Sequence, residues 1–160
     1  MINPEDFVEL CKSGSVQQVR EVIQAGVCID AKSQDNRTAL MAAAEENRDP
    51  EVIHVQIEAC AGVHTAIAAV KIGMLGTAPT IDVVEAALEE YRFPTVVLDP
   101  VLICKGQEFA SARAVDDALR ERILPRATMV TPNLFESATL AGMEEITSVA
   151  RLKDAARRIH

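Results

Sequence analysis

The feature that most constrains the fold is a pattern that occurs three times: a short apolar strand, a glycine or proline turn, and an amphipathic helix. The strand segments are Ala66 to Gly76, Thr95 to Val101 and Ala127 to Val130. Between them, apolar residues recur at helical spacing: Ile81, Val84, Leu88 and Tyr91 in one segment, and Ala112, Val115 and Leu119 in the next. Strands that alternate with helices pair in parallel, so the sequence predicts an α/β fold with a three-stranded parallel sheet and crossover helices.

The third strand leads directly into a helix through Thr131, Pro132 and Asn133. In open α/β sheets ligands bind beyond the carboxyl ends of the strands, and a helix N-terminus there offers free N–H groups to an anion. Asn133 and Glu136 would place an amide and a carboxylate at that opening. The same spacing also fits a capping box in which the two side chains only close the helix end, and spacing alone does not exclude this alternative.

Three motifs resemble those of a known family: K-I-G-M-L-G at residues 71–76, L-D-P-V at residues 98–101, and V-T-P-N-L-F-E at residues 130–136. In this order and at these separations they are similar to the hydroxymethylpyrimidine and phosphomethylpyrimidine kinases and the related pyridoxal kinases, which are ribokinase-like enzymes. The resemblance extends from about Gln56 to His160. It implies a partial ribokinase-like fold and, if the chain is active, an ATP-dependent phosphotransferase that acts on an alcohol group.

The resemblance also implies roles for single residues. Met74 would lie beside the pyrimidine or pyridine ring of the substrate, and Asp99, Lys105 and Asn133 would face the nucleotide phosphates. Asp99 and Glu136 would organise a magnesium ion through water, so ATP and Mg²⁺ are the implied cofactors. Two plainer interpretations stay open, because a methionine often fills a core and an aspartate before a proline is often a turn residue.

Two parts of the family pattern are not found in the sequence. The glycine-rich turn that carries the catalytic base and anion hole follows N-x-x-E in the family, and part of the substrate pocket precedes K-I-G-M-L-G. We therefore expect a kinase fragment without full catalytic activity, and we assign no catalytic residue. The last predicted helix has an apolar stripe that is expected to pack on a following strand, formed by Val149, Leu152, Ala156 and Ile159.

The first third of the chain shows a different period. Helix–turn–helix segments repeat after about 33 residues, which resembles ankyrin repeats. Two domains are therefore predicted, ankyrin-like helical repeats at residues 1–54 and a partial ribokinase-like segment at residues 55–160, joined within a helix without a linker. This arrangement suggests a recombined or engineered chimera, and extended fingers at Val27–Ala31 and around Ile29 to Asn36 would offer an ankyrin-type surface to a protein partner.

Composition limits the remaining function classes. A net charge of −8 and a pI near 4.9 argue against nucleic acid, which rewards clustered cations. No apolar run reaches the ~20 residues of a membrane helix and no basic-then-apolar leader is present, so we expect no membrane contact and a cytoplasmic chain. The open edge of the predicted sheet suggests self-association into a homo-oligomer.

Four cysteines are present, and Cys60 and His64 lie one helical turn apart. Two ligands do not make a zinc site, which needs about four. The sequence therefore predicts free thiols that mostly fill the core.

Overall fold

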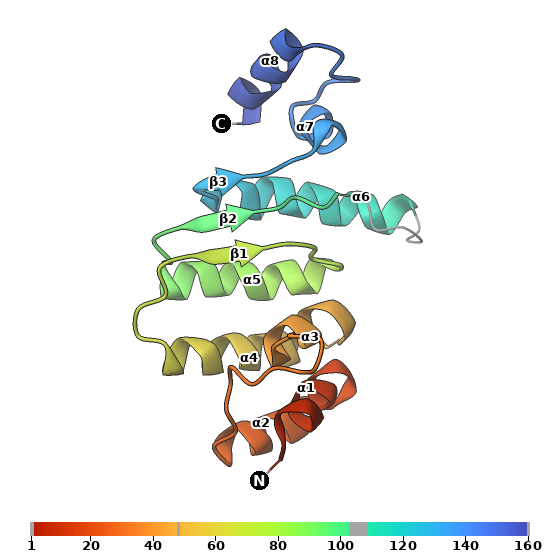
Figure 1. Ribbon diagram of the computed structural model, residues 1–160. Helices are drawn as coiled ribbons and strands as arrows, with labels where there is room; N and C mark the ends of the chain where they lie inside the picture. Colours follow the sequence, from red (N-terminus) through yellow and green to blue (C-terminus); the bar gives the residue numbers. More distant parts are fainter. Residues whose placement is uncertain (1, 48, 103–108, 160) are drawn as a thin grey trace. The chain divides into compact units, whose positions relative to one another are not determined.

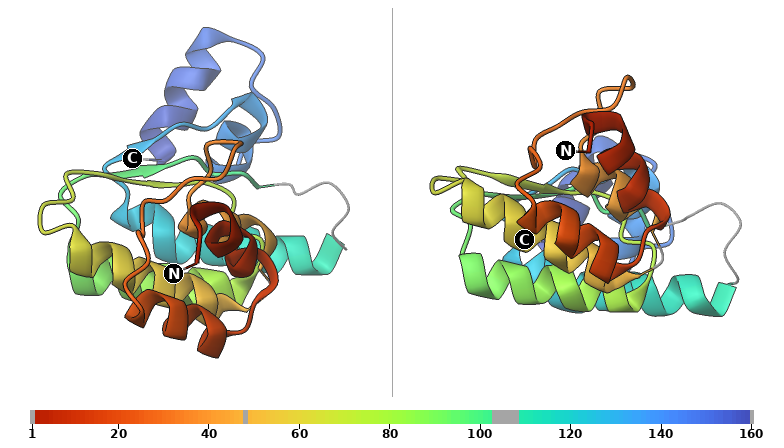
Figure 2. Two further views of the ribbon diagram at one scale, coloured as in Figure 1. Left: turned by 60° about the horizontal axis from the view of Figure 1, so that its bottom comes forward. Right: turned by 90° about the horizontal axis from the view of Figure 1, so that it is seen from below.

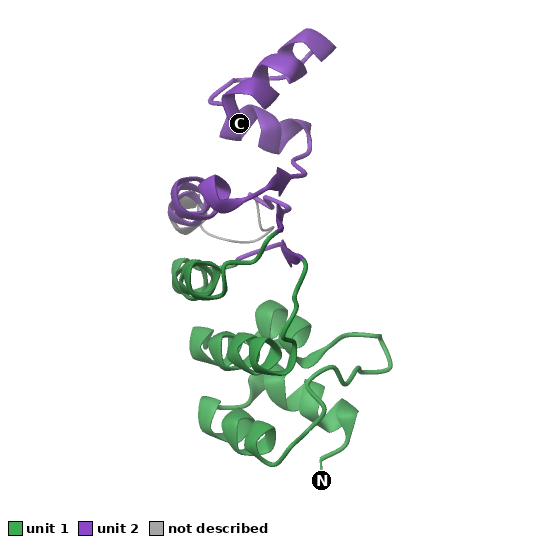
Figure 3. Cartoon of the chain, turned by 90° about the vertical axis from the view of Figure 1, so that its left-hand side faces the viewer, with its two compact units in different colours: residues 1–68, 76–94 green, residues 69–75, 95–160 purple. Residues whose placement is uncertain are grey.

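The computed structural model describes residues 2–47, 49–102 and 109–159 of the chain (Figure 1). It divides into two compact units, one made of Met1–Ala68 and Gly76–Pro94 and the other of Ala69–Leu75 and Thr95–His160 (Figure 3). This division follows packing within the chain. It does not test the predicted boundary between residues 54 and 55, which concerns the origin of the two sequence patterns and stays a prediction.

The first unit contains five helices among its described residues. Each helix begins after an N-cap residue whose side chain accepts a hydrogen bond from a backbone N–H of the first turn. Their bounds are α1 Pro4–Ser13, α2 Val16–Gln24, α3 Ala39–Glu46, α4 Pro50–Val63 and α5 Ala78–Tyr91. Ser15 and Gln18 form a reciprocal capping box at the start of α2. Pro4 and Pro50 each occupy the first turn of their helix, where a missing N–H costs nothing.

Helices α1 and α2 form one pair, and α3 and α4 form a second pair that stacks on the first. Helix α1 packs on α3, α2 packs on α4, and α4 also packs on α5. The two views of Figure 2 show α1 and α3 side by side. The described helices α1 to α4 therefore form two stacked helix pairs, and their ankyrin-like character stays a prediction.

The core of this stack is built from small and branched apolar side chains. Phe7, Val8 and Cys11 of α1 meet Ala39, Ala42 and Ala43 of α3 and the α4 residues Val52, Ile53 and Val55, and Val19 of α2 completes the cluster. All ten residues are buried. Alanines on α3 let the neighbouring helices approach closely, which explains how a chain with 3% aromatic residues fills this space.

The connection between α2 and α3 differs from the prediction. Residues 27–31 were expected to be extended, but the chain turns there, and the N–H of Ala31 donates to the carbonyl oxygen of Cys28. Pairing occurs later, in an isolated antiparallel bridge between Lys32 and Thr38. Asn36 lies between them with φ 62°, a left-handed conformation that asparagine tolerates better than most residues.

The second unit contains the predicted parallel sheet. Strands β1 Val70–Ile72, β2 Val96–Leu98 and β3 Met129–Val130 lie in the order β1-β2-β3, and both pairs are parallel. Lys71 pairs with Val97, and Val97 pairs with Met129. The α/β class and the three-stranded parallel sheet are therefore confirmed.

The connection from β2 to β3 runs through α6 Phe109–Ala118, which does not end as an ordinary α-helix. It continues as a π-helical turn at Leu119–Ile123 and a 3₁₀ turn at Leu124–Arg126. The wider turn buries both Leu119 and Ile123. Pro125 has no backbone N–H to donate to a helical hydrogen bond. The helix therefore changes type at the point where a regular α-helix would be interrupted.

Two helices follow the sheet, α7 Leu134–Leu140 and α8 Val149–Ile159, and they pack on each other. The predicted apolar stripe of the last helix is not its buried face. Val149 is 69% exposed and Leu152 is 38% exposed, whereas Ala155 is fully buried. The stripe was expected to pack on a following strand, so this exposure does not contradict the prediction.

No helix among the described residues is long and apolar enough to cross a membrane.

Candidate functional site

The candidate site lies at the carboxyl edge of the sheet. Backbone hydrogen bonds between neighbouring strands continue there for one residue beyond the ends of β2 and β3. The N–H of Asp99 donates to the carbonyl oxygen of Ile72 at 2.8 Å, and the N–H of Thr131 donates to that of Leu98 at 2.9 Å. Pro100, which follows Asp99, is among the fully buried side chains. Asp99 and Thr131 are therefore held in register at the edge where parallel sheets bind ligands.

Asp99 is one half of an ion pair that the sequence did not suggest. Its Oδ2 lies 3.1 Å from Nζ of Lys71, and the two side chains are 38% and 65% exposed. Lys71 is opposite Val97 in the sheet, and Asp99 is two residues further along, on the same face. This pair does not decide between a ligand-facing role and a plain turn role for Asp99, and both stay predictions.

Asn133 and Glu136 form the reciprocal cap that one interpretation of the sequence predicted. The N–H of Asn133 donates to Oε2 of Glu136 at 2.7 Å, and the N–H of Glu136 donates to Oδ1 of Asn133 at 2.9 Å. Glu136 is 8% exposed. The cap fixes both side chains at the opening of α7, and their predicted contacts with magnesium and phosphate stay predictions.

Met74 and Lys105 are the remaining predicted site residues. Met74 follows β1 and is 48% exposed, so it does not fill a core as the plainer interpretation held. Its predicted contact with a substrate ring stays a prediction. Lys105 lies outside the described residues.

Cys60 and His64 lie at the carboxyl end of α4. His64 Nε2 lies 3.0 Å from Oδ1 of Asp30, and burial together with the charge of Asp30 raises the pKa of the Cys60 thiol above its usual value. A protonated thiol is a poor ligand and a poor nucleophile. In the described part of the chain, no group of three or more His, Cys, Asp or Glu side chains is placed to hold a metal ion by itself.

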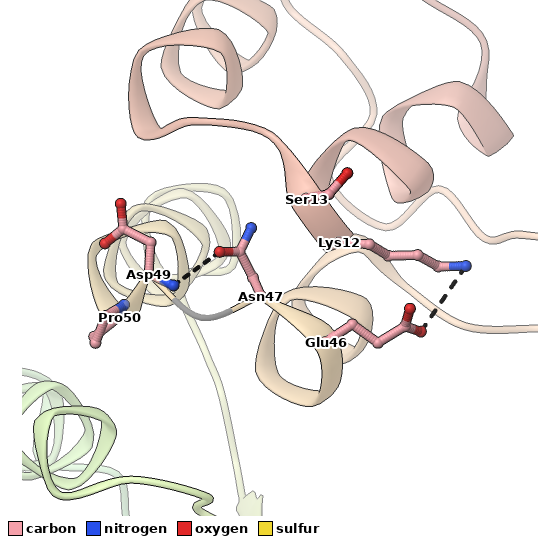
Figure 4. A pocket seen from close by; sticks show the side chains of 6 residues that line it. All are labelled: Lys12, Ser13, Glu46, Asn47, Asp49 and Pro50. Atoms are coloured by element: carbon pink, nitrogen blue, oxygen red, sulfur yellow. Dashed lines mark hydrogen bonds and ion pairs between the residues drawn. The ribbon is translucent and has the colours of Figure 1, made fainter.

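A surface hollow of about 600 Å³ lies in the first unit, at the ends of α1 and α3 and the start of α4 (Figure 4). It is lined by Lys12, Ser13, Glu46, Asn47, Asp49 and Pro50. Asn47 Nδ2 donates to the carbonyl oxygens of Cys11 and Gly14 at 2.9 and 3.3 Å, and Asp49 Oδ1 accepts from the N–H of Glu51 at 3.0 Å. These polar groups hold the helix ends together, so the hollow is explained by capping and we assign it no ligand.

Comparison with known proteins decides the family of the chain. Residues 22–160 match the profile of phosphomethylpyrimidine kinase. The chain belongs to this family. The match begins well before Gln56, so the kinase-type sequence extends further towards the N-terminus than the motifs alone predicted.

Among the relatives of this kinase-family chain is the putative pyridoxine kinase of Treponema pallidum (strain Nichols), which is 41% identical over 113 residues. These residues make up 70% of this chain and 41% of the relative. The ADP complex of Bacillus subtilis pyridoxal kinase has a TM-score of 0.60 at 37% identity, over 70% of this chain and 42% of that protein. A protein described as the last common ancestor of HMPPK and PLK/HMPPK vitamin kinases has a TM-score of 0.62 at 38% identity, over 70% of this chain and 49% of its own.

The kinase-family chain thus spans less than half the length of each of these three proteins. The predicted membership in the pyrimidine and pyridoxal kinases is confirmed. The predicted ankyrin resemblance receives no support from these comparisons.

Proposed function

We propose that the carboxyl edge of the sheet binds the phosphates of a magnesium nucleotide, as part of a kinase that acts on the hydroxymethyl group of pyridoxal or of hydroxymethylpyrimidine. The observation that carries this proposal is the placement of Asp99 and of the Asn133–Glu136 cap directly after neighbouring parallel strands of a kinase-family chain. The similar pyridoxal kinase of Bacillus subtilis was solved with ADP.

The side chains at this edge suit a hard cation. Mg²⁺ is usually held by one or two carboxylates, with phosphate oxygens and water as its other ligands. The carboxylate of Asp99 is 38% exposed, and therefore accessible, while its backbone is fixed by the sheet. When bound, the ion would offset the negative charge of the phosphates.

Each protein group has a distinct part in this proposal. Asp99 would hold the cation through water, and Asn133 would orient the phosphates from the start of α7. Glu136 keeps Asn133 in place through the cap and directs water to the cation. Met74 provides an apolar surface for the substrate ring.

We further propose that the chain alone does not turn over at a rate typical of the family. Its motifs supply positioning of phosphates but no base to take the proton of the substrate alcohol, and such a base contributes about 10²- to 10⁴-fold. Phosphorylation of pyridoxal or hydroxymethylpyrimidine by the purified chain at a rate of about 1 s⁻¹ or more would contradict this.

Isothermal titration calorimetry tests the binding proposal. Mg-ATP should bind the parent chain, and the D99N variant should bind at least about tenfold more weakly, because the amide removes the charge that attracts the cation. The matched control is D154N on α8, which makes the same change away from the edge. Equal affinity in the parent and D99N would remove Asp99 from the proposal, and no binding by the parent would remove the proposal itself.

A protein-binding role for the stacked helix pairs is the second candidate. It rests on the Lys32–Thr38 bridge, which projects a short loop between two helix pairs in the way expected of an ankyrin-like finger. In this proposal the chain is a chimera joined within α4. A natural gene that encodes these residues in a longer kinase chain of ordinary length would contradict it.

Self-association through an open sheet edge is proposed as well. The strands β1 and β3 are the outer strands of the sheet, and unpaired strand edges favour pairing with another chain. Sedimentation equilibrium should then show a dimer that V130P weakens, because proline cannot donate to a new ladder. A monomer at all concentrations would contradict this proposal.

A further inference from the structure

Lys71 and Asp99 form an exposed ion pair at the carboxyl edge of the sheet. We propose that Lys71 is a phosphate-binding residue of the edge site, held by Asp99 until a magnesium nucleotide arrives. This inference rests on the proposed function and adds a residue to it.

The sheet register places the ammonium group at the carboxyl edge. Lys71 lies opposite Val97, and Asp99 follows on the same face of the neighbouring strand. Nζ of Lys71 lies 3.1 Å from Oδ2 of Asp99. The long side chain therefore carries its charge from the middle of β1 to the end of β2, where the ligand is expected.

The aspartate side of the pair is fixed by the backbone. The N–H of Asp99 donates to Ile72, its carbonyl oxygen accepts from the N–H of Val101 at 2.9 Å, and Pro100 is buried. Since Asp99 cannot shift easily, the flexible partner is Lys71. Its ammonium is the group that can move when another cation approaches the carboxylate.

The stability of the folded chain does not explain why position 71 is a lysine. Its side chain is 65% exposed, and water screens exposed ion pairs so strongly that many contribute nothing measurable. A β-branched residue would suit the middle of a strand better. The charge at position 71 is therefore better explained by a ligand than by the fold.

A magnesium nucleotide supplies a new partner to each member of the pair. With the nucleotide bound, Asp99 would face the cation in place of the ammonium group, and Lys71 would donate hydrogen bonds to the phosphate oxygens, as lysines commonly do. No charge is left unpaired in either state. Free ATP without magnesium would lack the cation and would bring its negative charge towards Asp99, so binding should require the metal.

The test compares Mg-ATP binding by calorimetry in the parent chain and in the variants K71M, K71R and K153M. K71M should bind about tenfold more weakly, because a charge-assisted hydrogen bond is lost, whereas K71R keeps the charge and should stay within about threefold. K153M makes the same charge change on exposed α8 and should bind as the parent does. Thermal melting of each variant checks that it is folded.

A second titration, with MgCl₂ alone, separates a phosphate contact from a general effect of charge. K71M should bind Mg²⁺ as tightly as the parent or more tightly, because Asp99 is freed from its competitor. Equal Mg-ATP affinity in K71M and the parent, or an equal loss in K153M, would overturn the inference while the proposed function stands. Absence of Mg-ATP binding by the parent chain would overturn both.

Discussion

Replacing Gln56 by methionine should make the protein more stable, although it removes a hydrogen bond. Gln56 lies on α4 and is fully buried. Its Nε2 donates to Sγ of Cys11 at 3.1 Å, while its Oε1 is buried without a hydrogen-bond partner. If the amide were rotated by 180°, Oε1 would face the sulfur and Nε2 would be the buried group without a partner.

The expected gain follows from these contacts. A buried polar group without a partner costs about 1–3 kcal/mol, whereas the bond to sulfur that is given up is a weak one. Methionine has a similar length and flexibility, so it can fill the space without a cavity. The net stabilisation should be roughly 1–2 kcal/mol, and each kcal/mol raises the melting temperature of a chain of this size by about 2–4 °C.

Urea unfolding followed by circular dichroism measures this difference. The control is Q24M at the exposed end of α2, which makes the same chemical change in water and should stay within about 0.5 kcal/mol of the parent. If Q56M is less stable than the parent by 1 kcal/mol or more, the amide is satisfied in solution, and the account of this core is wrong.

Three further outcomes follow from the described geometry. G14A should destabilise by about 1–3 kcal/mol, since its Cβ would lie 2.5 Å from the backbone oxygen of Leu10, whereas G62A meets no atom within 4 Å and should be neutral or slightly stabilising in urea unfolding. Burial raises the pKa of the Cys11 thiol from 9.0 to about 12, so the folded state holds this proton more tightly and the free energy of unfolding should fall as pH rises from 9 towards 12. The C11V variant should show a shallower slope over this pH range, and an unchanged slope would contradict the assignment. E136A should cost a few tenths to about 1 kcal/mol through loss of the cap, and calorimetry should show weaker Mg-ATP binding, because Glu136 no longer holds Asn133 in place.

Local signals in the sequence were sufficient to predict the strands and the helix cap around the site. Alternation of strand and helix predicted the parallel sheet, and the spacing of Asn133 and Glu136 predicted the cap that the structure contains. Both features depend on residues close together in the chain. Periodicity and capping chemistry report such neighbours directly.

Features that depend on register or packing were missed. The Lys71–Asp99 pair requires the alignment of β1 with β2, and no spacing along the chain specifies that alignment. Ala155, the buried residue of α8, lies outside the predicted stripe, so its burial was missed as well. A signal for the ion pair was nonetheless present, because a lysine within an otherwise apolar strand invites a search for an acidic partner at its end.

The most direct test of the central claim is a thermal-shift scan of the chain with Mg-ATP, with ATP and a chelator, and with Mg-ATP plus pyridoxal or hydroxymethylpyrimidine. A ligand that binds only the native state stabilises it by about 2.7 kcal/mol at a concentration of 100 times Kd. We predict that Mg-ATP raises the melting temperature, that ATP without magnesium does not, and that D99N shows a clearly smaller shift than the parent. No shift at millimolar Mg-ATP, or an equal shift in D99N, would contradict a nucleotide site at this edge of the sheet.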